Sequence, residues 1–311
     1  MLIIFDKVMR RILQLLMTIL PQVLLKYVHQ KSGQYLVELD EKNKRKTEEL
    51  WNEKFSGQPK FIFQLEESLK IILYKDSVLS KLIYNGFEKD EIGFTKKVLQ
   101  QGDTFIDIGA NIGLYSLCAS ARVGETGRVI SFEPSSLTYQ RLLENIRINN
   151  FTNIASRNIG LSDKEGRLVL NQSENGFEAW NTFAKGEIKK FQNVIEVNVS
   201  TLDFELKGIE KDKISLIKID VEGWEKFVLC GASHLLTNYS PVIIVEFTET
   251  NTFAAGYFVQ DIYDLMERFG YEWFRYKEGK LIKESKQLHY PYDNLIATKN
   301  VVNLRNRLSE N

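Results

Sequence analysis

Residues 104–113 read TFIDIGANIG, and this stretch decides the fold more than any other part of the chain. An apolar strand runs into an acid, Asp107, and then into a turn with glycines at 109 and 113. Glycine has no Cβ, so it lets the backbone curl tightly and lets a small molecule come close. The helix predicted from Leu114 onward directs its unpaired amide hydrogens toward that loop. The stretch therefore predicts a small-molecule site between a strand and a helix.

The spacing of these glycines narrows the class of ligand. A dinucleotide site reads G-x-G-x-x-G and a phosphate loop ends in G-K-[ST], whereas this loop reads G-x-x-x-G. Asp107 would also repel a bound pyrophosphate, by about 4 kcal/mol at about 4 Å and an effective dielectric of 20. S-adenosylmethionine fits better, because its sulfonium and amino groups are cations and its carboxylate suits a helix N-terminus. A tight turn without a ligand is the alternative. The predicted cofactor contacts of this loop are Asp107, Gly109, Ala110, Asn111 and Gly113.

The composition is that of an ordinary globular protein. The chain has 311 residues, 43% of them hydrophobic, and a formal net charge of zero. A neutral chain argues against a nucleic-acid partner, since such proteins usually carry a basic excess. Two cysteines, at positions 118 and 230, lack a C-x-x-C spacing. This pattern indicates neither a disulfide framework nor a zinc site, and it favours a reducing, cytoplasmic compartment.

Alternating strand and helix patterns predict the fold class. From residue 104 onward they indicate an α/β, doubly wound, mostly parallel Rossmann-like sheet with helices on both faces. A helix near residue 140 is expected to bury Leu137, Leu142, Leu143 and Ile146. The predicted strands are residues 104–108, 128–132, 154–161, 216–219 and 242–245, followed by late strands at 271–276 and 294–298.

The predicted domain limits follow from this order. The sequence divides into an N-terminal helical extension (1–60), a hairpin with a helix that leads into the main domain (61–100), the cofactor-binding domain (101–300) and a C-terminal tail (301–311). An inserted hairpin is predicted at about 166–200, between the third and fourth strands. We interpret its polar and aromatic tip as a flap near the pocket mouth; a variable surface loop is the alternative.

The N-terminal residues 1–27 are apolar with basic residues among them. Their uncharged run, residues 12–25, is too short for a spanning helix, which needs about 20 predominantly apolar residues. Three alternatives stay open. The segment is a helix packed on the domain or on a second subunit of an oligomer, a peripheral helix on the cytoplasmic face of a membrane, or a signal or anchor.

Polar residues at strand ends supply further candidates, because ligands of such sheets bind outside the carboxyl ends of the strands. Four strands end in acids: Asp107, Glu133, Asp220 and Glu246. A carboxylate at position 133 can accept both hydroxyls of a ribose. The remaining cofactor candidates, placed where an adenine would lie although turn chemistry also explains them, are Asn158, Ser162 and Asp163.

Residues 218–225 read KIDVEGWE and form the candidate reactive centre. Lys218 and Asp220 project to the same side of a strand, and a lysine in an apolar strand requires a partner. Asp220 is the first candidate general base, with Glu222 and His289 behind it. Asp220 could instead hold the cofactor's amino group or a divalent cation; the sequence shows no separate set of metal ligands. A helix N-terminus with acids that complement its dipole is the alternative.

These motifs, taken in order, resemble the FkbM family of S-adenosylmethionine-dependent methyltransferases. The resemblance covers roughly residues 83–298 and implies a class I methyltransferase fold that usually methylates a hydroxyl of a sugar, glycan or secondary metabolite. It implies cofactor roles for Gly109, Asn111 and Glu133, and it matches Asp220 to the acid of the fourth-strand motif. The stretches that carry it are 84–88 (YNGFE), 105–113 (FIDIGANIG), 132–134 (FEP), 161–166 (LSDKEG) and 218–225 (KIDVEGWE).

The expected activity is direct methyl transfer from S-adenosylmethionine to a small-molecule or glycan acceptor. Methylation of nucleobase amines is disfavoured, because residues 220–223 read DVEG where those enzymes carry an NPPY-like turn. The alternative is a non-catalytic module that is derived from a methyltransferase and binds the cofactor or a partner.

Overall fold

The structure is a computed structural model that describes residues 48–173, 176–184 and 191–309. The chain forms two compact units, Met1–Gln58 and Pro59–Asn311. In the first unit, residues 48–55 are helical, and the three alternatives for residues 1–27 lie outside the described residues. No helix in the described part of the chain combines the length and apolar character needed to cross a bilayer. The sheets and the site belong to the second unit.

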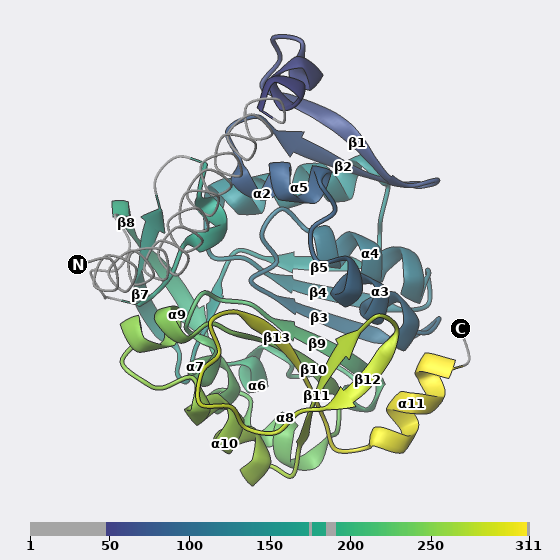
Figure 1. Ribbon diagram of the computed structural model, residues 1–311, viewed down its shortest axis with the longest axis vertical. Helices are drawn as coiled ribbons and strands as arrows, with labels where there is room; N and C mark the ends of the chain where they lie inside the picture. The colour runs from purple at the N-terminus through teal and green to yellow at the C-terminus, as the bar shows by residue number, and fades with distance from the viewer. Residues whose placement is uncertain (1–47, 174–175, 185–190, 310–311) are drawn as a thin grey trace, which may run out of the picture. The chain divides into compact units, whose positions relative to one another are not determined.

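A mixed sheet forms the centre of the second unit (Figure 1). Its strands are β3 (Thr104–Ile108), β4 (Arg128–Phe132), β5 (Ile154–Arg157), β9 (Ile214–Ile219), β10 (Val242–Phe247), β11 (Glu272–Lys277), β12 (Lys280–Lys283) and β13 (Asp293–Thr298). Within the described residues the order is β12-β11-β13-β10-β9-β3-β4-β5. The strands from β5 to β10 pair in parallel, whereas β13 is antiparallel to both of its neighbours. The predicted α/β sheet is confirmed, and the short edge strand β12 was not predicted.

Helices cover both faces of this sheet because successive strand residues point to opposite sides. Phe105 packs with the helices of one face, and its neighbour Ile106 packs with those of the other. The helices on the Phe105 side are α3 (Lys89–Val98), α4 (Leu114–Val123) and α11 (Val301–Ser309). Those on the Ile106 side are α6 (Leu202–Glu205), α7 (Glu225–Cys230), α8 (Ser233–Asn238) and α10 (Gln260–Arg268). Helix α11 occupies most of the predicted C-terminal tail, and its Leu304 is fully buried.

The predicted N-terminal hairpin is present as β1 (Lys60–Glu66) paired antiparallel with β2 (Leu69–Tyr74), followed by α2 (Val78–Tyr84). Strand β2 packs against α5 (Ser136–Ile148), where the backbone N–H of Ile72 donates to Asn145 Oδ1 at 2.6 Å. Leu137, predicted to be buried, is 58% exposed, while Leu142 and Ile146 are buried as expected. At 3.6 residues per turn, roughly 100° per residue, Leu137 lies on the side of α5 opposite Ile146 and cannot share its face.

The predicted third strand, residues 154–161, is two strands in two sheets. Asn158 breaks it, because its side-chain amide donates to the carbonyls of Glu133 and Pro134 and ends the pairing with β4. The chain then enters a sheet ordered β6-β8-β7 within the described residues. Its strands are β6 (Gly160–Leu161), β7 (Gly166–Ser173) and β8 (Phe191–Ser200). Helix α9 (Glu249–Ala254) follows β10.

Candidate functional site

A cavity of about 410 Å³ opens at the carboxyl ends of β3, β9 and β10. This is where ligands bind in open α/β sheets, and the volume suits a small molecule. The loop after β3 forms one side, and Ala179 and Trp180 from the segment between β7 and β8 form another. Five carboxylates and one ammonium line the cavity in the described part of the chain. These charged residues are Glu88, Asp107, Asp220, Glu222, Glu246 and Lys218.

The loop after β3 is held tightly against the turn after β9. Gly109 has a φ of +82°, and a Cβ on it would lie 1.8 Å from the carbonyl oxygen of Asp220. The Asp220 N–H in turn donates to the Ile108 carbonyl at 3.0 Å. The N–H groups of Gly109 and Ala110 both donate to the carbonyl of Phe132. The loop thus uses these two amides to fix its own shape, so they are not available to a ligand.

Lys218 is the buried cation of the site. It pairs in register with Asp107 on β3, and its Nζ lies 2.6 Å from Asp220 Oδ2 and 4.5 Å from the Tyr115 ring centroid. Burial lowers the pKa of Lys218, but Asp220 and neighbouring carboxylates outweigh it and raise that pKa. Burial also raises the pKa of Asp107 to about 6, although Lys218 and Ser116 oppose this. The predicted pairing of Lys218 with Asp220 is confirmed.

The candidate reactive carboxylates lie together. Asp220, Glu222 and Glu246 each place a carboxylate oxygen within 4.8 Å of the other two. Glu222 accepts from the Asn251 side chain at 2.7 Å, and Glu246 accepts from Thr248 Oγ1 at 2.8 Å. Burial, followed by the charge of Asp220, raises the pKa of Glu246 well above its usual range. The sequence had marked Glu246 as a strand-end acid but had not placed it in the reactive centre.

Glu88 completes the acidic lining from the start of α3. Its two carboxylate oxygens accept hydrogen bonds from Tyr115 at 2.6 Å, and from Tyr292 at 2.8 Å and Asn294 at 3.0 Å. The phenol of Tyr115 comes from α4, whereas the other two donors lie about 200 residues further along the chain. Sequence reasoning missed these contacts, because no local pattern links segments so far apart.

Glu133, the predicted ribose ligand, lines a second cavity of about 40 Å³ beside the first. Its carboxylate accepts from the backbone N–H groups of Asn111 and Ser135, both at 2.9 Å. Burial raises the pKa of Glu133 to about 7, although the hydrogen bonds from these two donors lower it. The segment 178–183 covers this cavity.

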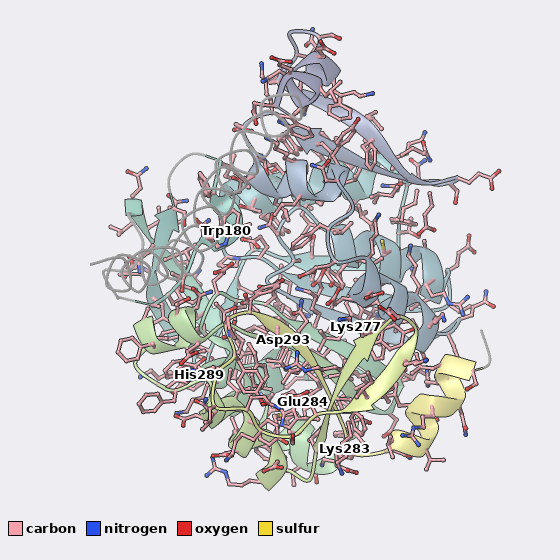
Figure 2. All side chains as sticks on the ribbon, viewed as in Figure 1. Trp180, Lys277, Lys283, Glu284, His289 and Asp293 are labelled. Carbon is pink, nitrogen blue, oxygen red and sulfur yellow. The ribbon has the colours of Figure 1, made fainter. Side chains whose placement is uncertain are left out.

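Five predicted site residues, Gly113 among them, do not line either cavity. Asn158 is engaged in the bend after β5, and buried Ser162 bonds to Asp163 and to the Trp224 indole. His289 is 77% exposed, with Nδ1 3.4 Å from the Glu249 carboxylate. Figure 2 shows His289 well apart from Trp180 of the cavity wall. The structure therefore does not bring His289 to Asp220 and Glu222.

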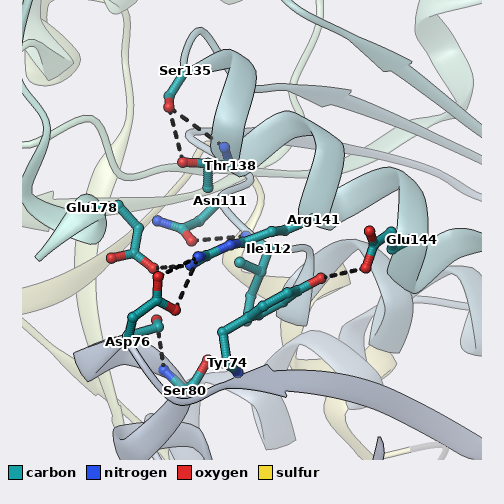
Figure 3. Close-up of polar contacts among 11 residues, drawn as sticks. Tyr74, Asp76, Ser80, Asn111, Ile112, Ser135, Thr138, Arg141, Glu144 and Glu178 are labelled. Atoms are coloured by element: carbon teal, nitrogen blue, oxygen red, sulfur yellow. Dashed lines mark hydrogen bonds and ion pairs between the residues drawn. The ribbon is translucent and has the colours of Figure 1, made fainter. Parts of the chain in front are cut away.

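Arg141 ties the segment that covers the Glu133 cavity to the rest of the unit (Figure 3). One of its nitrogens lies 2.6 Å from Glu178, and another lies 2.9 Å from Asp76 after β2. The guanidinium also stacks over the Tyr74 ring, 4.2 Å from its centroid. Both Arg141 and Glu178 are about nine-tenths buried, so the pair is well shielded from water.

Replacing Arg141 with alanine is expected to lower the free energy of unfolding by about 3 kcal/mol, because Glu178 is left buried without its cation. Hydrogen exchange should accelerate most at residues 176–184. The matched control is Arg167→Ala, which breaks an exposed pair with Glu196 and should cost less than about 1 kcal/mol. Equal exchange rates at 176–184 in both variants would show that Arg141 does not hold this segment.

The strand order and the acid-lined cavity at the strand ends define a class I methyltransferase-like α/β protein. The sequence profile of the methyltransferase FkbM domain matches residues 107–273, more than half of the chain. The chain belongs to this family of S-adenosylmethionine-dependent methyltransferases.

The chain is also similar to individual proteins, at low sequence identity. The hexuronic acid methyltransferase AglP of Haloferax volcanii is 29% identical over 160 residues, which cover 50% of this chain and 61% of AglP. Among solved structures, the FkbM methyltransferase of Methylobacillus flagellatus is 16% identical with a TM-score of 0.41, covering 70% of this chain and 54% of the other. An O-methyltransferase of Thermotoga maritima is 15% identical with a TM-score of 0.39, covering 80% of each chain.

Proposed function

We propose that the protein methylates a hydroxyl oxygen of a sugar or glycan. The supporting observation is the acid-lined cavity beside the Gly109 loop, in a chain of the FkbM family. The name of the relative AglP, a hexuronic acid methyltransferase, favours a sugar as the acceptor class. S-adenosylmethionine supplies an activated methyl group, because its sulfonium sulfur leaves as a neutral thioether.

The residues present suit this cofactor. A lining with an excess of carboxylates favours a ligand that carries a sulfonium and an ammonium group. We assign the methionine end to Asp107 and to the loop from Gly109 to Asn111, with Gly113 placing the start of α4. We assign the ribose hydroxyls to Glu133, whose oxygens retain lone pairs beyond those used by the backbone.

We place the acceptor on the other side of the cavity. Trp180, Phe87 and Tyr292 supply aromatic surface to the cavity, and its carboxylates can accept hydrogen bonds from the hydroxyl groups of a sugar. Asp220 is the proposed general base, and Glu222 is the next candidate. With the cofactor bound, the Asp220 carboxylate would take up the proton that the acceptor hydroxyl releases on methylation.

Methyl-transfer assays over neutral, amino and uronic sugar acceptors test this function, with release of S-adenosylhomocysteine as the readout. Calorimetry with S-adenosylhomocysteine tests cofactor binding separately. We expect binding together with turnover on at least one sugar. Binding without turnover on sugars, other hydroxyl acceptors or lipid-linked glycans would instead support the non-catalytic module.

Cofactor affinity is expected to fall at acidic pH because of Glu133. Ribose hydroxyls donate to the ionised carboxylate, so binding favours the deprotonated form. The pKa of Glu133 is raised to about 7 before binding. Affinity should therefore approach its maximum above about pH 8 and decline as the pH falls through 7. Between pH 8 and pH 6 the Kd for S-adenosylhomocysteine should rise about tenfold by calorimetry.

The control for this prediction is Glu133→Gln, which cannot titrate. Its Kd for S-adenosylhomocysteine should be higher than that of the wild type at pH 8. That Kd should change far less between pH 8 and pH 6. A wild-type Kd that stays constant over the same range would remove Glu133 from the ribose site.

A further inference from the structure

The carboxylates of Asp220, Glu222 and Glu246 form a cluster, here termed the carboxylate triad, at the reactive end of the cavity. Asp220 and Glu222 come from the turn after β9, and Glu246 comes from the end of β10, which is hydrogen-bonded to β9. The triad therefore lies at the carboxyl ends of two adjacent strands of the central sheet. Such rigid placement is what a preorganised ligand site requires.

Glu246 supplies an independent sign that the triad binds something. Its Oε1 accepts from Thr248, but its Oε2 is buried and has no hydrogen-bond partner among the described residues. The residue as a whole is only 4% exposed. A buried polar atom without a partner is costly, and more so when it is charged. The unpartnered oxygen belongs to a side chain that lines the cavity, so a ligand that enters the cavity can satisfy it.

Lys218 does not fill this role. In the described part of the chain it forms its ion pair with Asp220 Oδ2, and no ion pair forms at Glu246. Its ammonium also lies over the ring of Tyr115. Tyr115 belongs to α4 and not to β10, the strand that carries Glu246. The contact with Lys218 uses one oxygen of Asp220, and both Asp220 and Glu246 line the cavity.

We propose that the carboxylate triad binds one divalent cation of the hard, oxygen-preferring class, Mg²⁺ or Mn²⁺. Mg²⁺ lies about 2.0–2.1 Å from its ligand oxygens, so two oxygens on one ion are at most about 4.2 Å apart. The triad oxygens all lie within 4.8 Å of one another, so side-chain movements of less than about 1 Å bring them within reach of one ion. Ions of this class prefer carboxylate oxygens as ligands, whereas softer metals prefer thiolate or imidazole ligands.

Neighbouring side chains hold the triad in position for this role. Asn251 donates to Glu222 and Thr248 donates to Glu246, and both donors line the cavity. Hydrogen bonds of this kind orient carboxylate ligands and typically change metal affinity by about 10- to 100-fold when removed. The triad thus has both the ligand atoms and the outer contacts of a cation site.

The cation would serve the proposed function, and this part of the inference rests on that function. A divalent cation beside Asp220 would orient the acceptor hydroxyl and make its proton easier to remove. Metal binding itself does not depend on methyl transfer, so the two can be tested separately.

The experiment is a titration of the full chain with Mn²⁺, in which paramagnetic resonance measures the free ion. We expect one site per chain, and Glu246→Gln should weaken it at least about tenfold. The matched control is Glu272→Gln, which changes an exposed glutamate of β11 that pairs with Lys283 and should leave Mn²⁺ binding unchanged.

Two further measurements keep the outcome clear. Calorimetry with S-adenosylhomocysteine in the presence of EDTA reports whether each variant is folded and tests the proposed cofactor site without metal. If Glu246→Gln fails to fold, Glu222→Gln takes its place with the same expected loss. Absence of stoichiometric Mn²⁺ binding up to about 1 mM would overturn the proposal. So would wild-type affinity in a folded triad variant.

Discussion

Replacing Asp220 with asparagine is expected to lower kcat by about 100- to 10,000-fold, which is the usual contribution of a general base. The Asp220 carboxylate faces the cavity between the Gly109 loop and Glu246. Asparagine keeps the shape of the side chain but cannot take up the acceptor proton. It also removes the charge that is paired with Lys218, whose side chain is 4% exposed. Steady-state kinetics with the best acceptor gives kcat, and calorimetry gives the Kd for S-adenosylhomocysteine.

The matched control is Asp261→Asn, because Asp261 also pairs with a lysine, Lys226 at 2.7 Å, but on the outer helices α7 and α10. Its kcat should stay close to that of the wild type. A kcat near wild type in Asp220→Asn, with an unchanged Kd, would remove Asp220 as the base. A raised Kd with kcat retained would instead place Asp220 at the cofactor's amino group.

Excess Mn²⁺ separates the two remaining roles of Asp220. If its carboxylate chiefly holds the cation, raising the Mn²⁺ concentration should restore much of the lost kcat by mass action. If it removes the proton, the loss should persist when the metal site is saturated. Glu246→Gln should respond to Mn²⁺ in the first manner, because it lies in the triad but is not the proposed base.

The central strands could be predicted because they are buried on both faces. Such strands read as continuous apolar runs, and the predicted limits of β3 and β4 agree with the structure. The partnership of Lys218 with Asp220 was predictable for a related reason. Side chains two residues apart on a strand share a face, and a buried ammonium requires a counter-charge.

Other features depend on packing that the sequence does not display. The buried face of α5 includes Asn145, because β2 offers it a hydrogen bond, whereas Leu137 lies on the opposite, exposed side of the helix. The contacts of Glu88 with Tyr115 and Tyr292 join segments that meet only when the sheet is assembled. Glu246 is different, since the rule that ligands bind at the carboxyl ends of strands could have added it to the reactive centre.

Replacing Gly109 with alanine is expected to lower the free energy of unfolding by more than about 4 kcal/mol, which is exceptional for one methyl group. Two effects add. The φ of +82° penalises any L-residue by about 1–2 kcal/mol. The new Cβ would also lie 1.8 Å from the carbonyl oxygen of Asp220, a backbone atom that no side-chain rotation can move. Relief requires the loop after β3 to separate from the turn after β9, which carries the proposed base.

The control is Gly270→Ala, because Gly270 has a nearly identical φ of +83° but no neighbouring atom within 4 Å of the position that a Cβ would take. It should lose only the backbone penalty of about 1–2 kcal/mol. The difference between the two variants in denaturant unfolding isolates the collision with Asp220. S-adenosylhomocysteine binding should be lost in Gly109→Ala and retained in Gly270→Ala. Equal losses of stability in both variants would mean that the loop and the turn can separate at little cost in free energy. The close approach of Gly109 to Asp220 would then not determine the shape of the site.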